Sequence, residues 1–227
     1  MAKSVITIDG PAASGKSTVA RLLAEKLGAI FLDTGAMYRA VTLAAINADV
    51  NMEDTQQLLA VLEKTKFDFV AELDHMFVSI NEADVTENIR SPEVTANAHY
   101  IASAAALREK LVRMQRQFAA KYDKIVTEGR DQGTVAFPDA DVKFYLVAGV
   151  DERARRRQAE LVAKGIETHL EQIKQAIEKR DASDRNRTVG PLTAADDAVI
   201  VDTTALSIDE VMDKLLGVVK EKCSQND

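Results

Sequence analysis

A glycine-rich run near the start of the chain has the residue types and spacing of a phosphate-binding loop. Gly10 and Gly15 let the backbone curl, so that successive N–H groups point inward at phosphate oxygens. Lys16 can reach the β- and γ-phosphates as a point charge, and Ser17 offers a hydroxyl to Mg²⁺. We therefore predict that ATP binds here with Mg²⁺, with Lys16 as a catalytic residue and Ser17 as the metal ligand. The predicted ATP-binding residues are Gly10, Pro11, Ala12, Ala13, Ser14, Gly15, Lys16, Ser17 and Thr18.

The elements around this loop are those that the motif requires. Apolar residues 5–8 predict a buried strand before it, and residues 16–26 predict a helix after it, which Gly28 ends. The start of that helix adds the positive end of its dipole to the phosphate site. Core strands are predicted near residues 5, 30, 124, 143 and 199. Because helices alternate with these strands, we expect an α/β fold with a five-stranded parallel sheet flanked by helices.

The middle of the chain predicts a small antiparallel insert between about residues 65 and 90. Residues 67–70 and 76–80 are short strand-like runs with a turn at residues 72–74. Ser91 then caps a helix that carries Pro92 in its first turn and is broken near Ser103.

Capping boxes predict where two later helices begin. Thr168 to Glu171 opens a helix that runs to about Asp184, and Ser207 to Glu210 opens the terminal helix.

Arginines and carboxylates follow two of the predicted strands. Residues 33–39 follow the second strand and residues 128–131 follow the third, so both runs are expected at the carboxyl edge of the sheet, beside the phosphate loop. Arg39 falls in the first turn of the next predicted helix, where it can face an anion, and Glu128 or Asp131 could serve the metal region. Taken alone, these residues also suit a capped helix and a structural ion pair.

Two arginine-rich runs lie further along the chain. Arg180, Asp184 and Arg187 are spaced four and three apart, so they share one face if the helix persists. The run at residues 153–157 predicts a mobile lid that closes over the triphosphate. A solvated charged face is the alternative for each run. In a chain of net charge -7, the local arginines together favour two anionic substrates that meet head to head.

The composition excludes several other classes of protein. The net charge of -7 argues against a nucleic-acid partner. A single cysteine cannot form a disulfide framework within the chain, which fits a reducing cytoplasm. No apolar stretch approaches the ~20 residues of a membrane span. We expect a cytoplasmic monomer that binds neither nucleic acid nor membrane.

Four motifs resemble the bacterial cytidylate kinase family, in chain order: residues 8–18, 33–39, 128–138 and 180–187. The last two are much more specific than the phosphate loop. The resemblance implies a P-loop kinase fold with a core, a helical lid and a part that binds the nucleoside monophosphate (NMP) and is enlarged by the antiparallel insert. It also implies phosphoryl transfer from ATP to CMP or dCMP.

The resemblance further implies a division of the chain and roles for its residues. The core comprises residues 1–34, 92–150 and 186–227, the NMP-binding part residues 35–91, and the lid residues 151–185. Arg130, Arg156 and Arg157 join Lys16 as catalytic residues. The implied CMP-binding residues are Thr34, Arg39, His99, Arg108, Arg130, Asp131, Arg180, Asp184 and Arg187.

Within the implied CMP site, the resemblance assigns different parts of the nucleotide to different residues. It places Thr34, Arg108, Asp131 and Arg187 near the cytosine. Arg39 and Arg130 hold the phosphate, and Arg180 and Asp184 reach the sugar and phosphate. His99 stands where the family pattern has a serine, and it also suits a partly exposed helix position.

Two alternatives remain open from the residues themselves. One is a kinase for another small acceptor, such as UMP, dTMP or shikimate. The other is a P-loop nucleotide switch that binds protein partners, although the N-K-x-D motif of GTPases is missing from the sequence.

Overall fold

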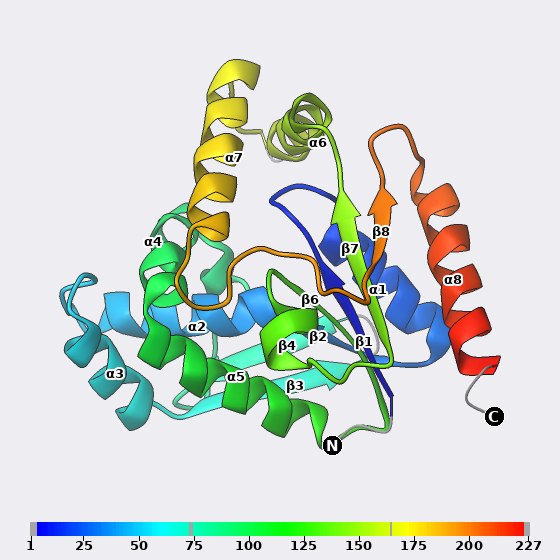
Figure 1. Cartoon of the computed structure of the whole chain (residues 1–227). Helices are drawn as coiled ribbons and strands as arrows, with labels where there is room; N and C mark the ends of the chain where they lie inside the picture. The colour runs from blue at the N-terminus through cyan, green and yellow to red at the C-terminus, as the bar shows by residue number, and fades with distance from the viewer. Residues whose placement is uncertain (1–3, 73–74, 164, 225–227) are drawn as a thin grey trace. The chain divides into compact units, whose positions relative to one another are not determined.

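Five strands form the main parallel sheet, in the order β2-β6-β1-β7-β8 (Figure 1). The computed structural model describes residues 4–72, 75–163 and 165–224. The strands are β1 (Ser4–Asp9), β2 (Ile30–Asp33), β6 (Lys124–Gly129), β7 (Val142–Val147) and β8 (Val199–Asp202). The predicted α/β class and five-stranded parallel sheet are therefore confirmed.

The chain forms two compact units, which we describe separately. Unit 1 comprises Met1–Ser4 and Ala24–Thr127, and unit 2 comprises Val5–Leu23 and Glu128–Asp227. The division into core, NMP-binding part and lid is a functional one and stays a prediction.

The predicted insert in unit 1 is a three-stranded antiparallel sheet. Its strands are β3 (Phe67–Glu72), β4 (His75–Ile80) and β5 (Ala83–Asp84). Phe67 pairs with Ile80 at one end of the β3–β4 hairpin, and Glu72 pairs with His75 at the other. Residues 73 and 74 of the predicted turn lie outside the described residues.

Helices supply most of the core of unit 1. They are α2 (Thr34–Asn47), α3 (Thr55–Lys64), α4 (Pro92–Ser103) and α5 (Ala105–Ala119), with the 3₁₀ turn η1 (Asn88–Arg90) before α4. Met37, Leu58, Ile101 and Leu107 are fully buried. Ser91 caps α4 as predicted, because its hydroxyl accepts from Val94 N–H at 3.3 Å. The predicted break between α4 and α5 is at Ala104, which is extended.

Helix α3 was not predicted, and α2 begins two residues before Ala36, where the sequence predicts the start of a helix over residues 36–48. Asp54 caps α3 through the N–H groups of the next turn. Asp33 caps α2, because its Oδ1 accepts from Ala36 N–H at 2.8 Å. The helix therefore begins at Thr34, and Arg39 lies in its second turn, not its first.

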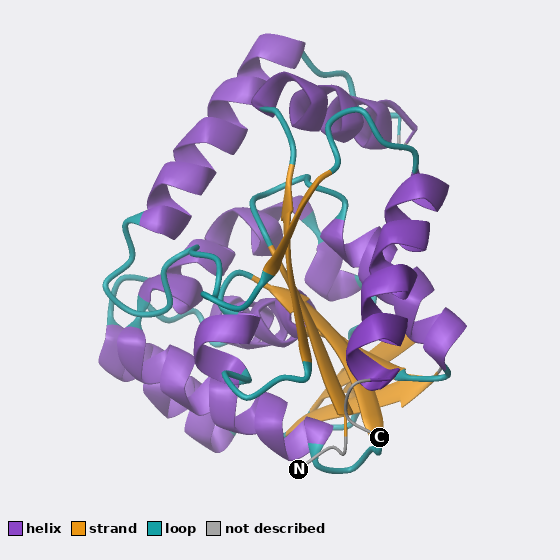
Figure 2. Cartoon of the chain, turned by 45° about the vertical axis from the view of Figure 1, so that its right-hand side comes forward, coloured by secondary structure: helices purple, strands orange, loops and turns teal. Residues whose placement is uncertain are grey.

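Unit 2 contains β1, β7 and β8, which pair in parallel. Its helices are α6 (Val150–Ala163), α7 (Leu170–Arg185) and α8 (Ile208–Ser224), and α1 (Lys16–Leu27) begins in it. A π-helical turn, η2 (Gln132–Ala136), follows β6. Helices α6 and α7 lie next to each other in both views (Figure 1; Figure 2) and share a buried cluster of Ala154, Ile173 and Ile177.

The two predicted capping boxes have different outcomes. Ser207 Oγ accepts from Glu210 N–H at 3.3 Å and donates to Glu210 Oε2 at 2.9 Å, so this box is confirmed. The box at Thr168 is wrong, because His169 is the N-cap of α7 and makes no side-chain cap.

Replacing Ser207 with alanine should lower the free energy of unfolding by about 1 kcal/mol, because the cap is lost. Thr168→Ala is the matched control, since the Thr168 hydroxyl is buried without a hydrogen-bond partner among the described residues. Its loss should change stability by less than about 0.5 kcal/mol. Urea denaturation of both variants measures the difference, and equal losses would contradict the assignment.

Candidate active site

The phosphate loop joins β1 to α1 through a turn that needs unusual backbone angles. Gly10 has φ +152°, and a Cβ there would lie 2.2 Å from the carbonyl oxygen of Leu146. Gly15 has φ +89° and Ala13 has φ 58°. Gly10 is therefore required both by its conformation and by the close approach of the neighbouring backbone.

Lys16 is buried inside this loop. Its Nζ donates to the carbonyl oxygen of Pro11 at 2.6 Å and lies 3.4 Å from Ser14 Oγ. Burial lowers the pKa of Lys16 well below its ordinary value, and the positive charges of Arg130 and Arg180 lower it further. A bound anion would reverse this shift, so the electrostatics of the loop favour phosphate.

The side chains of Ser17 and Glu128 place two oxygen atoms of the kind that Mg²⁺ prefers next to each other. Ser17 Oγ donates to Glu128 Oε1 at 3.0 Å. Mg²⁺ commonly binds through one or two such groups together with phosphate oxygens and water. In the described part of the chain, no group of three or more His, Cys, Asp or Glu residues could hold a metal by itself. The pair therefore fits a metal that arrives with a nucleotide.

Asp9 fixes the loop that follows β6. Its carboxylate is buried and accepts from the N–H groups of Gln132 at 2.9 Å and Gly133 at 2.8 Å. Burial raises the pKa of Asp9 to about 6, with Asp131 adding to the rise, although the two backbone hydrogen bonds oppose it. These contacts hold the segment that carries Arg130 and Asp131.

Arg130, Asp184 and Arg187 form an ion-pair cluster in unit 2. Arg130 Nε donates to Asp184 Oδ2 at 2.7 Å, and Arg187 pairs with Asp184 Oδ1. Arg180 and Asp184 both lie on α7, which ends at Arg185, so the condition that the helix persists to Arg187 is not met. Arg187 lies just beyond the helix and still pairs with Asp184, three residues earlier.

The arginines of α6 point in different directions. Arg156 donates to the hydroxyl of Thr203 at 3.1 Å and to its carbonyl oxygen at 2.5 Å. Arg156 Nη1 also lies 3.9 Å from the position of a Cβ on Gly15, so this arginine adjoins the phosphate loop. Arg157 pairs with Glu160 on the helix surface.

In unit 1, Asp33 gathers two arginines after β2. Its Oδ2 lies 3.3 Å from Arg39 Nη2 and 3.4 Å from Arg90 Nη2. Sequence reasoning missed Arg90, which lies in η1 at the end of the insert and belongs to none of the recognised motifs. Arg90 can be identified only from the folded structure, where it shares the carboxylate of Asp33 with Arg39, a predicted phosphate ligand.

Two other predicted residues of unit 1 have contrasting environments. Arg108 is buried, donates to the carbonyl oxygen of Ala102 at 3.1 Å, and lies over the ring of Tyr38 at 5.7 Å. His99 is exposed on α4, with Nδ1 2.7 Å from the carbonyl oxygen of Ala96. Arg108 is therefore held in place, whereas His99 lies against the backbone of its own helix.

Within each unit, the structure assembles part of the predicted site. Unit 1 contains Thr34, Arg39, His99 and Arg108. Unit 2 contains the phosphate loop and the remaining predicted residues, including Asp131, Arg156, Arg157 and Arg180. The roles of all these residues stay predictions.

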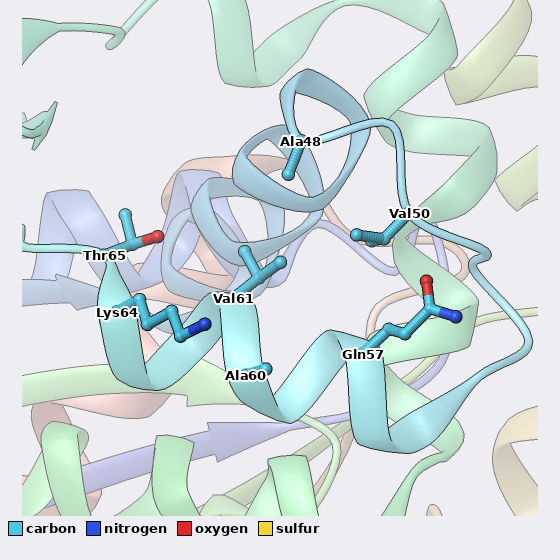
Figure 3. A pocket seen from close by; sticks show the side chains of 7 residues that line it. All are labelled: Ala48, Val50, Gln57, Ala60, Val61, Lys64 and Thr65. Carbon is cyan, nitrogen blue, oxygen red and sulfur yellow. The ribbon is translucent and has the colours of Figure 1, made fainter.

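A groove in unit 1 contains none of the predicted nucleotide-binding residues. It lies between the end of α2 and α3 (Figure 3). Ala48, Val50 and Val61 line it, and Lys64 is its one charged lining residue. The groove therefore lacks the group of cations that a triphosphate requires.

Comparison with known proteins identifies the family. The family model for cytidylate kinase matches residues 6–221. The chain belongs to the cytidylate kinase family. It is 47% identical over 219 residues to the cytidylate kinase of Leuconostoc mesenteroides, covering 96% of this chain and 97% of that protein. It is also 47% identical over 214 residues to the cytidylate kinase of Bacillus thuringiensis, covering 94% and 95% of the two chains.

A solved structure supports the fold of this cytidylate kinase family member. An uncharacterized protein from Eubacterium ventriosum aligns with a TM-score of 0.52 over 96% of this chain and 99% of that one, at 12% identity. Among the described residues of the chain, none of the helices has the length and apolar character needed to cross a membrane.

The shifted pKa of Asp9 predicts a pH-dependent stability of the nucleotide-free protein. An unfolded aspartate ionises near pH 3.8, whereas folded Asp9 stays protonated up to about pH 6. Stability from this group is present below pH 3.8 and is lost as the pH rises through 6, by up to roughly 3 kcal/mol. Urea titrations measure the free energy of unfolding of Asp9→Asn and of the unaltered protein at pH 4 and at pH 7. The difference between the two proteins should shift in favour of Asp9→Asn as the pH rises from 4 to 7. A pH-independent difference between the two proteins would be inconsistent with the shift.

Proposed function

We propose that this chain transfers the γ-phosphoryl group of ATP to CMP and dCMP, giving ADP with CDP or dCDP. The observation that carries the proposal is the phosphate loop itself, in which Lys16 is buried with its Nζ 2.6 Å from the carbonyl oxygen of Pro11 and has the cationic Arg130 and Arg180 nearby. Two phosphate-bearing substrates would neutralise this charge together. Membership of the cytidylate kinase family supports CMP as the acceptor.

The donor occupies the phosphate loop in this proposal. Backbone N–H groups of residues 13–18 and the ammonium of Lys16 hold the triphosphate. Ser17 and Glu128 would hold Mg²⁺ directly or through water, and the bound metal would neutralise charge on the transferred group. Arg156, which adjoins Gly15, and Arg157 would share that charge, with residues 151–185 acting as the lid.

The acceptor needs positioning rather than deprotonation. The phosphate of CMP is largely dianionic at pH 7, since its second pKa is about 6. Arg39 and Arg130 would hold it, and we add Arg90 because it shares Asp33 with Arg39. These cations align the acceptor oxygen with the γ-phosphorus and balance its negative charge.

Base and sugar contacts come from the remaining predicted residues. Thr34, Arg108, Asp131 and Arg187 would read the cytosine, and Arg180, Asp184 and His99 would contact the sugar or phosphate. The proposal further includes a monomeric, cytoplasmic enzyme with a core (1–34, 92–150, 186–227) and an NMP-binding part (35–91).

An acceptor panel tests the proposal. ADP release is measured with ATP, Mg²⁺ and each of CMP, dCMP, UMP, dTMP and shikimate. We expect CMP and dCMP to give the highest kcat/KM. A higher kcat/KM for one of the other acceptors, or ADP release only with a protein partner, would overturn the assignment.

Replacing Lys16 with alanine should lower kcat by about 100-fold or more, because a preorganised charge is lost where the transition state is most negative. Lys26→Ala is the matched control, since Lys26 lies in the last turn of the same helix. Steady-state kinetics of both variants decide, and near-normal kcat for Lys16→Ala would exclude the catalytic role.

Replacing Arg187 with methionine should reduce discrimination between CMP and UMP by about tenfold or more, because a base-reading hydrogen-bond donor is removed. The KM for ATP should change little. Arg185→Met, two residues earlier at the exposed end of α7, serves as the control. Unchanged selectivity in Arg187→Met, measured as the ratio of kcat/KM values, would refute base reading by this side chain.

A further inference from the structure

Buried side chains from α6 and α7 bind both polar groups of one phosphate-loop residue. The N–H group of Ala12 donates to Asp181 Oδ1 at 3.1 Å, and Arg153 Nη1 donates to the carbonyl oxygen of Ala12 at 3.1 Å. Arg153 Nη1 also lies 2.5 Å from Asp181 Oδ2. All three residues are buried, so water does not compete freely for these bonds.

The next residue of the loop is held by the same two helices through apolar contact. Ala13 has φ 58°, a conformation that residues with a Cβ rarely adopt. Its methyl group packs against the cluster of Ala154, Ile173 and Ile177 between α6 and α7. Such a backbone conformation persists where the surrounding structure holds it.

The buried ion pair is not needed merely to join the two helices. Lys174 and Asp151 already link α7 to α6 at 2.7 Å on the surface. Arg153 is itself fixed by a further hydrogen bond from Nε to the carbonyl oxygen of Ala148 at 2.9 Å. What distinguishes the Arg153–Asp181 pair is its contact with Ala12.

We propose that Arg153 and Asp181 are positioning residues that set the conformation of the phosphate loop for the triphosphate. The Ala12 N–H is committed to Asp181, and the pair acts on ATP through the loop rather than by touching it. Through this pair, the packing of helices α6 and α7 affects how tightly the phosphate loop binds ATP. The inference rests on the proposed function only in taking this loop as the ATP site.

A charge-neutral double variant, Arg153→Met with Asp181→Leu, tests the inference. It removes both contacts with Ala12 without changing the net charge near the phosphates, and apolar replacement of a buried ion pair is usually tolerated by a fold. Binding of N-methylanthraniloyl-ATP with Mg²⁺ is measured by fluorescence on protein shown to be folded by circular dichroism. We expect Kd to rise by about tenfold, the effect of losing one to two hydrogen bonds that hold the loop.

The control is Asp151→Asn with Lys174→Gln, which removes the surface ion pair between the same helices. Its Kd should stay within about twofold of the unaltered protein. An equal rise in both double variants, or an unchanged Kd in the Arg153–Asp181 variant, would overturn the inference.

If the Arg153–Asp181 variant does not fold, Ala13→Gly decides. Glycine accepts the positive φ but removes the methyl group that packs on α6 and α7, so Kd should rise by about threefold. An unchanged Kd refutes the inference.

Acceptor phosphorylation is assayed separately on the unaltered protein, so that ATP binding without CMP phosphorylation refutes the proposed function and leaves the positioning role intact.

Discussion

Lys16 carries its ammonium group in a buried position, where burial and the guanidinium groups of Arg130 and Arg180 lower its pKa. Lost hydration and these like charges disfavour the ammonium form, and the nearby carboxylates of Glu128 and Asp9 offset this only in part, so further negative charge stabilises the arrangement. Phosphate groups supply that charge during the proposed reaction. The same repulsion that costs stability in the free protein therefore becomes attraction for two anionic substrates, and most strongly for the transition state between them.

Three buried carboxylates of unit 2 hold the loops around this charge. Asp9 fixes the turn after β6, Asp184 binds Arg130, and Asp181 binds Arg153 and the N–H group of Ala12. Each carboxylate accepts hydrogen bonds from groups on a different segment from its own. Helix α7 carries two of them one turn apart, so a single helix contacts both the phosphate loop and the arginine that follows β6. Preorganisation of this kind lowers the cost of ordering loops when substrates bind.

Features governed by local rules could be predicted from the sequence. The phosphate loop, its flanking strand and helix, the antiparallel insert and the Ser207 cap each depend on a few neighbouring residues. Features that depend on tertiary partners could not. Local patterns also fail at one helix end, because Thr168 has the sequence of a capping box, yet α7 begins after His169. Arg90 and Asp181 gain their positions only through folding, so no spacing rule could identify their contacts with Asp33 and Ala12.

Direct transfer between two nucleotides is the central claim, and tracing the transferred phosphorus tests it most directly. The unaltered protein is incubated with Mg²⁺, CMP and ATP labelled with ³²P at the γ-position, and the products are separated by chromatography. The account predicts that the label appears in CDP, at the β-phosphate, in step with ADP formation. Label that appears as inorganic phosphate or on the protein, with CMP left unchanged, would contradict it.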